Sequence, residues 1–144
     1  MSRGLVLLIV AGAAASAQAD SVCYSTLQEA FFAWTETAWD ACHLQYTAPD
    51  IDLATRGYCS VWSKSYDVAK CDPLWANYSK CGLKAAKLLK ADNTFDDAAF
   101  KATMLQNECS ADAKFIAAYP TCKNSTMKYL NFGRLNVCLQ KALY

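Results

Sequence analysis

The sequence predicts an all-α protein, a single disulfide-stapled bundle of five or six helices that follows a cleaved signal peptide. Only five glycines and three prolines occur among the 144 residues, while alanine, leucine and lysine, which favour helices, are frequent. Apolar residues recur at steps of three and four in successive segments. No segment sustains the alternation of period two that is typical of a strand. A chain of this length supports one domain.

Residues 1–19 have the pattern of a secretory signal peptide. Arg3 precedes a short apolar run at residues 5–10, and Ala17-Gln18-Ala19 has the form of an A-x-A cleavage site. We therefore expect cleavage before Asp20 and a secreted, extracellular domain over residues 20–144. No later run of about 18 apolar residues follows, so we expect no integral membrane segment.

The mature domain has balanced charge. Without Arg3, 13 basic residues stand against 13 acidic ones. No net positive field is then available to attract nucleic acid or an anionic membrane. We therefore expect no nucleic-acid partner.

All eight cysteines lie after residue 19, and an even number in an exported chain predicts four disulfides. The tight C-x-x-C and H-x-x-x-H spacings of zinc sites do not occur, so we expect no metal site. The cysteines are Cys23, Cys42, Cys59, Cys71, Cys81, Cys109, Cys122 and Cys138.

The first predicted helix covers about residues 24–46. Thr26 followed by Glu29 fits a capping box at its start. Pro49 ends it, because proline disfavours the helical conformation of the residue before it. The apolar face of this helix comprises Leu27, Phe31, Trp34, Ala38 and Cys42.

Two further helices are predicted over about residues 58–71 and 73–91. Asp72-Pro73 indicates the start of the second, because aspartate caps free amides and proline suits the first helical position. Asp92-Asn93 ends it. The expected apolar faces comprise Tyr58, Trp62 and Tyr66 in the first and Leu74, Tyr78, Cys81, Ala85 and Leu88 in the second.

The remaining sequence predicts a helical stretch from about residue 95 to Pro120 and a final helix at about residues 125–142. Thr94 with Asp97 resembles an N-terminal cap. A break near Cys109 is an alternative to one continuous helix. Gly133 is a weak point of the final helix.

Helix geometry limits the disulfide pairing. A helix rises about 1.5 Å per residue, and a disulfide needs Cα atoms within about 7 Å. This excludes Cys23–Cys42 and disfavours pairs within one predicted helix. We therefore expect bridges between different helices, such as Cys42–Cys59 or Cys81–Cys109. The disfavoured pairs are Cys59–Cys71, Cys71–Cys81 and Cys122–Cys138.

His43 is the single candidate for a general base of near-neutral pKa. Its place after Cys42 is similar to the catalytic helix of secreted phospholipases A2, but Leu44 stands where that family has aspartate. The acidic segments that start at Asp50 and Asp92 lack the glycine and glutamate of an EF-hand loop. No nucleotide-binding or hydrolase motif occurs. We therefore expect no catalytic residue, no cofactor and no enzymatic activity.

Four features of the mature domain concern its surface. Asn77-Tyr-Ser79 and Asn124-Ser-Thr126 are glycosylation sequons, either of which could remain unused. Lys80, Lys84 and Lys87 form a stripe that is either the hydrated side of a helix or a contact for an acidic partner. Phe31 and Phe32 point about 100° apart, so one of them leaves the core face. The expected contact residues are Phe32, Trp39, Lys80, Lys84 and Lys87.

These features predict a secreted, non-enzymatic recognition or effector protein. It would bind an extracellular protein or receptor through a rigid, disulfide-bonded helical surface. The alternative is an extracellular carrier of a small hydrophobic ligand, a lipid or odorant-like molecule, in an internal apolar cavity. Insect odorant-binding proteins have such an architecture, but the closely spaced second and third cysteines of that family are missing here.

Overall fold

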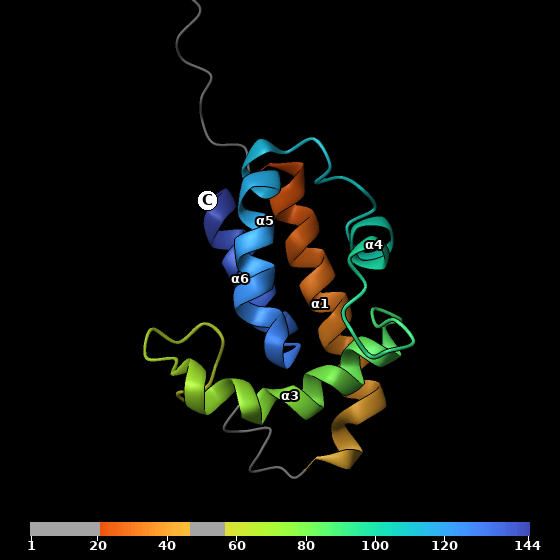
Figure 1. Ribbon diagram of the computed structural model, residues 1–144, viewed down its shortest axis with the longest axis vertical. Coiled ribbons are helices and arrows are strands. Elements are labelled where there is room, and N and C mark those ends of the chain that lie inside the picture. Colours follow the sequence, from red (N-terminus) through yellow and green to blue (C-terminus); the bar gives the residue numbers. More distant parts are fainter. Residues whose placement is uncertain (1–20, 47–56) are drawn as a thin grey trace, which may run out of the picture.

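The computed structural model describes residues 21–46 and 57–144 and is all-helical over these residues (Figure 1). No strand occurs in these ranges, although Leu89 and Phe95 form an isolated β-bridge. The all-α, disulfide-stapled fold that the sequence predicts is therefore confirmed. The predicted signal peptide and residues 47–56 lie outside the described residues. The α-helices are α1 (Val22–Cys42), α3 (Val68–Ala85), α4 (Asp97–Ala99), α5 (Ala113–Thr126) and α6 (Phe132–Leu143).

Three helices stand upright and one crosses beneath them. Figure 1 shows α1, α5 and α6 side by side, with α3 running across their lower ends. The tightest packing is between α1 and α3, between α5 and α6, and between α1 and α6. Together, these contacts place one apolar core between the upright helices and α3.

Helix α1 has the predicted apolar face, with a different start. Ser21 is the N-cap and accepts a hydrogen bond from the backbone N–H of Tyr24. The capping box expected at Thr26 is wrong, because the hydroxyl of this residue donates to the carbonyl of Val22 inside the helix. A single 3₁₀ turn, His43–Gln45, follows the helix. The buried residues of α1 are Cys23, Leu27, Ala30, Trp34, Ala38 and Cys42.

Helix α3 runs through the position where a helix start was predicted. Asp67 is the N-cap and accepts from the N–H groups of Ala69 and Lys70, and Pro73 lies inside the helix. The predicted helix over residues 58–71 is wrong, because residues 57–66 form turns before α3. Asp72 caps nothing, because its carboxylate binds groups from other parts of the chain.

The segment before α5 contains two short elements and a turn. Asp96, not Thr94, caps α4 by accepting from the N–H of Ala99. Phe100–Met104 continues as a π-helix. Turns at residues 105–111 then divide the predicted stretch, so the alternative of a break near Cys109 is correct. Asp112 caps α5, which contains Pro120 and does not end there.

The range predicted as one final helix contains the end of α5, a 3₁₀ turn and α6. Helix α5 ends at Thr126, and a 3₁₀ turn, Met127–Tyr129, leads to Leu130 in the left-handed conformation with φ 54°. Asn131 then caps α6 by accepting from the N–H of Arg134. The chain therefore reverses between α5 and α6, which pack side by side.

All eight cysteines form disulfides: Cys23–Cys109, Cys42–Cys81, Cys59–Cys71 and Cys122–Cys138. Both suggested pairs, Cys42–Cys59 and Cys81–Cys109, are wrong, and two disfavoured pairs are present with Cα atoms 5.2 and 5.7 Å apart. Helix geometry separates two cysteines only where one continuous helix carries both. Cys59 instead lies in a turn that folds back on α3, and Cys122 and Cys138 lie on different helices.

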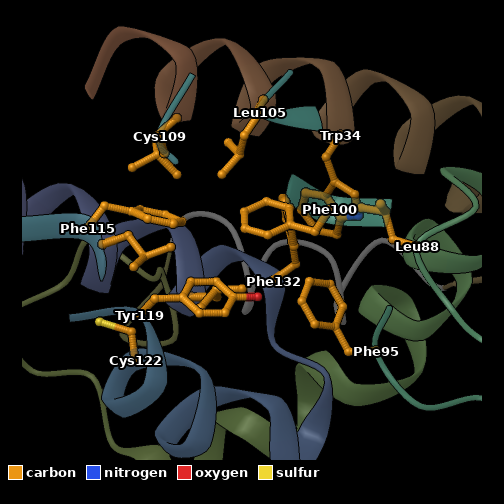
Figure 2. Close-up of a cluster of buried hydrophobic side chains, with 14 of the residues drawn as sticks. Trp34, Leu88, Phe95, Phe100, Leu105, Cys109, Phe115, Tyr119, Cys122 and Phe132 are labelled. Atoms are coloured by element: carbon orange, nitrogen blue, oxygen red, sulfur yellow. The ribbon is translucent and has the colours of Figure 1, made fainter. Parts of the chain in front are cut away.

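The core is rich in aromatic rings (Figure 2). Phe132 is fully buried, and its ring centroid lies 5.0 Å from that of Trp34 and 5.7 Å from that of Phe100. At the crossing of α1 and α3, a Cβ atom on Gly82 would lie 2.6 Å from the Cβ of Ala38. The two helix backbones can therefore approach closely only because residue 82 has no side chain.

Candidate functional site

Two predicted contact residues lie on the outer side of α1. Phe32 is 65% exposed and Trp39 is 49% exposed. They are seven residues apart and so point in nearly the same direction. Trp39 stacks on His43, with ring centroids 4.8 Å apart, and Nδ1 of His43 makes a hydrogen bond with the carbonyl of Trp39. His43 thus completes the end of α1 with its own side chain.

Phe32 belongs to a continuous group of partly exposed rings. The ring of Phe31 lies 6.2 Å from that of Phe32 and 6.0 Å from that of Trp62, in edge-to-face contacts. Trp62 is 53% exposed. We call Phe31, Phe32 and Trp62 the aromatic surface. It joins the middle of α1 to the turns at residues 57–66.

The sequence-based prediction missed Trp62 because it placed this residue on the apolar face of a helix. A signal was present, since Gly57 and serines at 60, 63 and 65 are residues that favour turns. Two backbone hydrogen bonds form these turns. The N–H of Ser60 donates to the carbonyl of Gly57, and the N–H of Ser63 donates to the carbonyl of Ser60.

The turn segment that carries Trp62 is attached to the rest of the fold at several points. The Cys59–Cys71 disulfide ties it to α3, and Nε1 of Trp75 donates to the carbonyl of Cys59 at 2.9 Å. Val61 packs against α6. A Cβ atom added to Gly133 of this helix would lie 3.1 Å from the Cγ1 atom of Val61. These contacts fix the backbone beneath the aromatic surface.

A buried polar cluster around Asp72 holds the end of the same segment. The carboxylate of Asp72 accepts from the hydroxyl of Tyr66 at 2.7 Å and from Nδ2 of Asn131 at 3.0 Å, and it forms an ion pair with Arg134. Burial, and then the hydrogen bond to Asp72, raise the pKa of the Tyr66 hydroxyl. Since each polar group has a partner, the cluster joins the turns, α3 and α6.

The predicted lysine contacts are exposed. Lys80 and Lys84 lie on the side of α3 opposite its buried residues. Lys87 follows the helix in the left-handed conformation, with φ 58°. Within the described residues, no cation–π contact joins these three lysines to the aromatic surface.

The two sequon asparagines are exposed, whereas the third residues of both sequons are buried. Asn77 lies three residues before Lys80, on the lysine side of α3. The hydroxyl of Ser79 donates to the carbonyl of Leu130 at 2.5 Å. Asn124 lies in the last turn of α5, and the hydroxyl of Thr126 donates to the carbonyl of Cys122 at 2.7 Å.

A small pocket of about 190 Å³ lies beside the π-helix, with Lys101, Asn107 and Ser110 among its lining residues. Pockets for drug-sized ligands have volumes of about 300–1,000 Å³. The pocket is therefore smaller than the internal cavity that a lipid carrier needs.

Neither a metal cluster nor a membrane span occurs in the described part of the chain. No group of three His, Cys, Asp or Glu side chains within it could hold a metal ion. None of its helices is both long and apolar enough to cross a bilayer. Asp92 instead accepts from the N–H and hydroxyl of Thr94, and Asp50 lies outside the described residues.

Comparisons with protein-family models, with curated proteins and with solved structures gave no match to this chain.

Proposed function

We propose that the protein is a secreted, non-enzymatic recognition protein that binds an extracellular protein or receptor through its aromatic surface. The observation that carries the proposal is the contact of two largely exposed rings, Phe32 and Trp62, through the partly buried ring of Phe31. Adjacent exposed aromatic side chains are characteristic of protein-binding surfaces, where such residues contribute most of the binding energy.

The backbone that carries the three rings is held in place by other parts of the fold, which supports a binding role for the aromatic surface. A Cys59–Cys71 bridge and the Trp75 hydrogen bond hold the Trp62 segment, and α1 carries the two phenylalanines on a regular helix. A surface that is ordered before binding loses little conformational entropy on association. Its rings therefore retain most of the free energy gained by their burial.

The leader pattern and the cysteine pairing support secretion. Disulfides form and persist in oxidising compartments, and here every cysteine is paired. Residues 1–19 supply the basic, apolar and small-residue regions of a signal peptide. With 13 basic and 13 acidic residues in the mature domain, recognition depends on apolar contact more than on long-range attraction.

The position of Asn77 favours the aromatic surface over the lysine stripe. A glycan on Asn77 would project from the side of α3 that carries Lys80 and Lys84. Such a glycan would compete with a protein partner for the surface around these lysines. The aromatic surface, on α1 and residues 57–66, contains neither sequon.

The test uses the secreted full chain with Phe32→Ser and Trp62→Ser, and Leu74→Ser as the matched control. Leu74 is 47% exposed on α3, outside the aromatic surface. Labelled protein is screened against purified extracellular domains, and the affinity of each variant is measured for any domain bound. We expect each aromatic substitution to weaken binding about tenfold or more, and Leu74→Ser to leave it unchanged.

Three results would contradict the proposal. The first is equal affinity of all three variants, and the second is failure of every extracellular domain to bind. The third is native mass spectrometry that shows a co-purifying ligand of lipid size, which would favour the carrier.

A further inference from the structure

The pocket beside the π-helix combines an apolar floor with a polar rim. Leu105 and Phe115 are buried, and Ile116 is 56% exposed at the mouth. Cys109, bridged to Cys23, completes the floor. Figure 2 shows Cys109 and Phe115 as neighbours at one end of the buried cluster. An engineered apolar cavity of about 150 Å³ in another protein holds one benzene molecule. The floor therefore has room for one six-membered ring or a short alkyl chain.

The polar rim carries three hydrogen-bond donors, of which one is positively charged and none is negatively charged. Lys101, Asn107 and Ser110 line it, and Lys101 is the one charged residue among the lining side chains. Ammonium, amide and hydroxyl groups can all donate to a carboxylate. A ligand with an anionic end and an apolar body matches both parts of the pocket.

The ammonium group of Lys101 lies over the ring of Tyr119. Its Nζ lies 4.3 Å from the ring centroid of Tyr119. Tyr119 in turn donates to Asp97 at 2.6 Å, and Lys123 donates to the same carboxylate at 2.5 Å. The charge of Lys101 also acts on the Asp97 carboxylate, so two lysines share one carboxylate and this group carries one positive charge in excess.

The backbone of the rim is unusual in two respects. Phe100–Met104 is a π-helix, a form that is rare and often found at functional sites. Gln106 and Asn107 are consecutive residues in the left-handed conformation, with φ 48° and 60°. Non-glycine residues adopt this conformation at a cost in free energy, and such residues cluster at ligand sites. The hydrogen bond from the N–H of Asn107 to the carbonyl of Lys101 holds this turn against the π-helix.

We propose that this pocket binds a small monocarboxylate, with its ring or short chain on the apolar floor and its carboxylate at Lys101, Asn107 and Ser110. The site is separate from the aromatic surface, and the inference does not depend on the proposed function.

The test is an NMR titration of the ¹⁵N-labelled full mature domain with sodium benzoate and, separately, with benzamide, which has the same shape without the charge. Lys101→Gln removes the rim charge, and Lys84→Gln is the matched control on α3. Ile116→Trp places a larger side chain at the mouth of the pocket, where residue 116 is partly exposed. Circular dichroism checks that each variant is folded.

We expect benzoate to cause saturable shifts at the amides of residues 101–116. Lys101→Gln should weaken benzoate roughly fivefold, the upper range for an exposed ion pair, and leave benzamide unchanged. Lys84→Gln should have no effect, and Ile116→Trp should abolish binding. The proposal is overturned by an absence of saturable shifts, by equal affinity for benzamide and benzoate, or by equal benzoate affinity in the Lys101 and Lys84 variants.

Discussion

The guanidinium of Arg134 forms an ion pair with the carboxylate of Asp72, which is 2% exposed, and thereby joins α6 to α3. Tyr66 and Asn131 donate to the same carboxylate, so the negative charge is buried with three donors around it. The pair lies under the segment that carries Trp62. The segment that carries Trp62 is therefore anchored, through Tyr66, to a charged group in the interior.

Arg134→Met is expected to destabilise the fold by about 3 kcal/mol, because it leaves the carboxylate of Asp72 buried without its cation. This is the low end of the range for buried pairs, since the Arg134 side chain is 18% exposed. Urea denaturation measures the change. Lys141→Met, an exposed substitution on α6, is the control. A loss below 1 kcal/mol would contradict the structural role of the pair.

Stability is expected to fall as the pH rises above about 10. Burial and the bond to Asp72 raise the pKa of Tyr66, and burial and the bond to Asp97 raise that of Tyr119. Above pH 10 these hydroxyls lose protons in the unfolded chain but keep them in the folded one, so the unfolded state gains stability. The two hydroxyls contribute their full stabilisation of the fold below pH 10. This stabilisation is lost as the pH rises from 10 toward the higher pKa values of the folded state.

Absorbance titration of the tyrosines and urea denaturation at pH 9 to 11.5 measure this effect. Tyr66→Phe should reduce the loss of stability between these pH values. Tyr144→Phe, at an 85% exposed position, should not change it. An identical pH profile for Tyr66→Phe and the unsubstituted protein would refute the assignment to Tyr66.

Gly82→Ala is expected to destabilise the fold by about 1–3 kcal/mol, because the added Cβ would lie 2.6 Å from the Cβ of Ala38. The double variant with Ala38→Gly removes that clash. We expect it to be more stable than the sum of the two single changes predicts, as a double-mutant cycle of urea denaturation would show. If the changes in unfolding free energy of the two single variants simply add, α1 and α3 can move apart at residue 82 without a loss of stability.

The four disulfides are expected to contribute unequally. Cys59–Cys71 closes a loop of 12 residues, whereas Cys23–Cys109 spans 86 residues that the Cys42–Cys81 bridge shortens. Chain entropy gives about 3 kcal/mol for the short loop and about 4 kcal/mol for the long one. Paired cysteine-to-serine variants and urea denaturation test the order. The reverse order would show that native contacts, not loop closure, decide these contributions.

Glycan addition is expected to precede folding. The hydroxyls of Ser79 and Thr126 are buried and hydrogen-bonded, although Asn77 and Asn124 are exposed. A transferase that reads the whole tripeptide can therefore reach it in the unfolded chain alone. In a cell-free reaction, reduced and unfolded protein should accept glycans, and the folded, oxidised protein should not. Asn77→Gln and Asn124→Gln assign each site by mass. Equal modification of folded protein would contradict this order.

The sequence predicts the all-helical class and the apolar face of α1 because these depend on local periodicity. Leu27, Trp34 and Ala38 recur at helical spacing, and all three are buried. The Asp72-Pro73 signal is misleading because the partners of Asp72 are distant in sequence: Asn131 and Arg134 lie about 60 residues away. Once these partners hold the carboxylate, the helix continues through the proline.

The disulfide pairs and the surface could not be predicted for a related reason. The pairing of Cys122 with Cys138 requires a reversal at Leu130, and no glycine marks that left-handed residue. The exposure of Trp62 depends on turns that lie against α3 and α6. Phe32 and Trp39 are exposed, as expected for contact residues, but Trp62 joins Phe32 through a tertiary contact that the periodicity of α1 does not contain.

The span of the Cys23–Cys109 bridge has a consequence for biosynthesis. Cys23 is the first cysteine to leave the ribosome, and its partner emerges 86 residues later, after four other cysteines. During elongation its thiol must therefore stay reduced or exchange out of transient mixed pairs, while Cys59 and Cys71 can close as soon as both have been translated. Oxidation in strict order of appearance would join Cys23 to Cys42, which is not a native pair, so the native set forms only with delayed oxidation of Cys23 or with thiol–disulfide exchange.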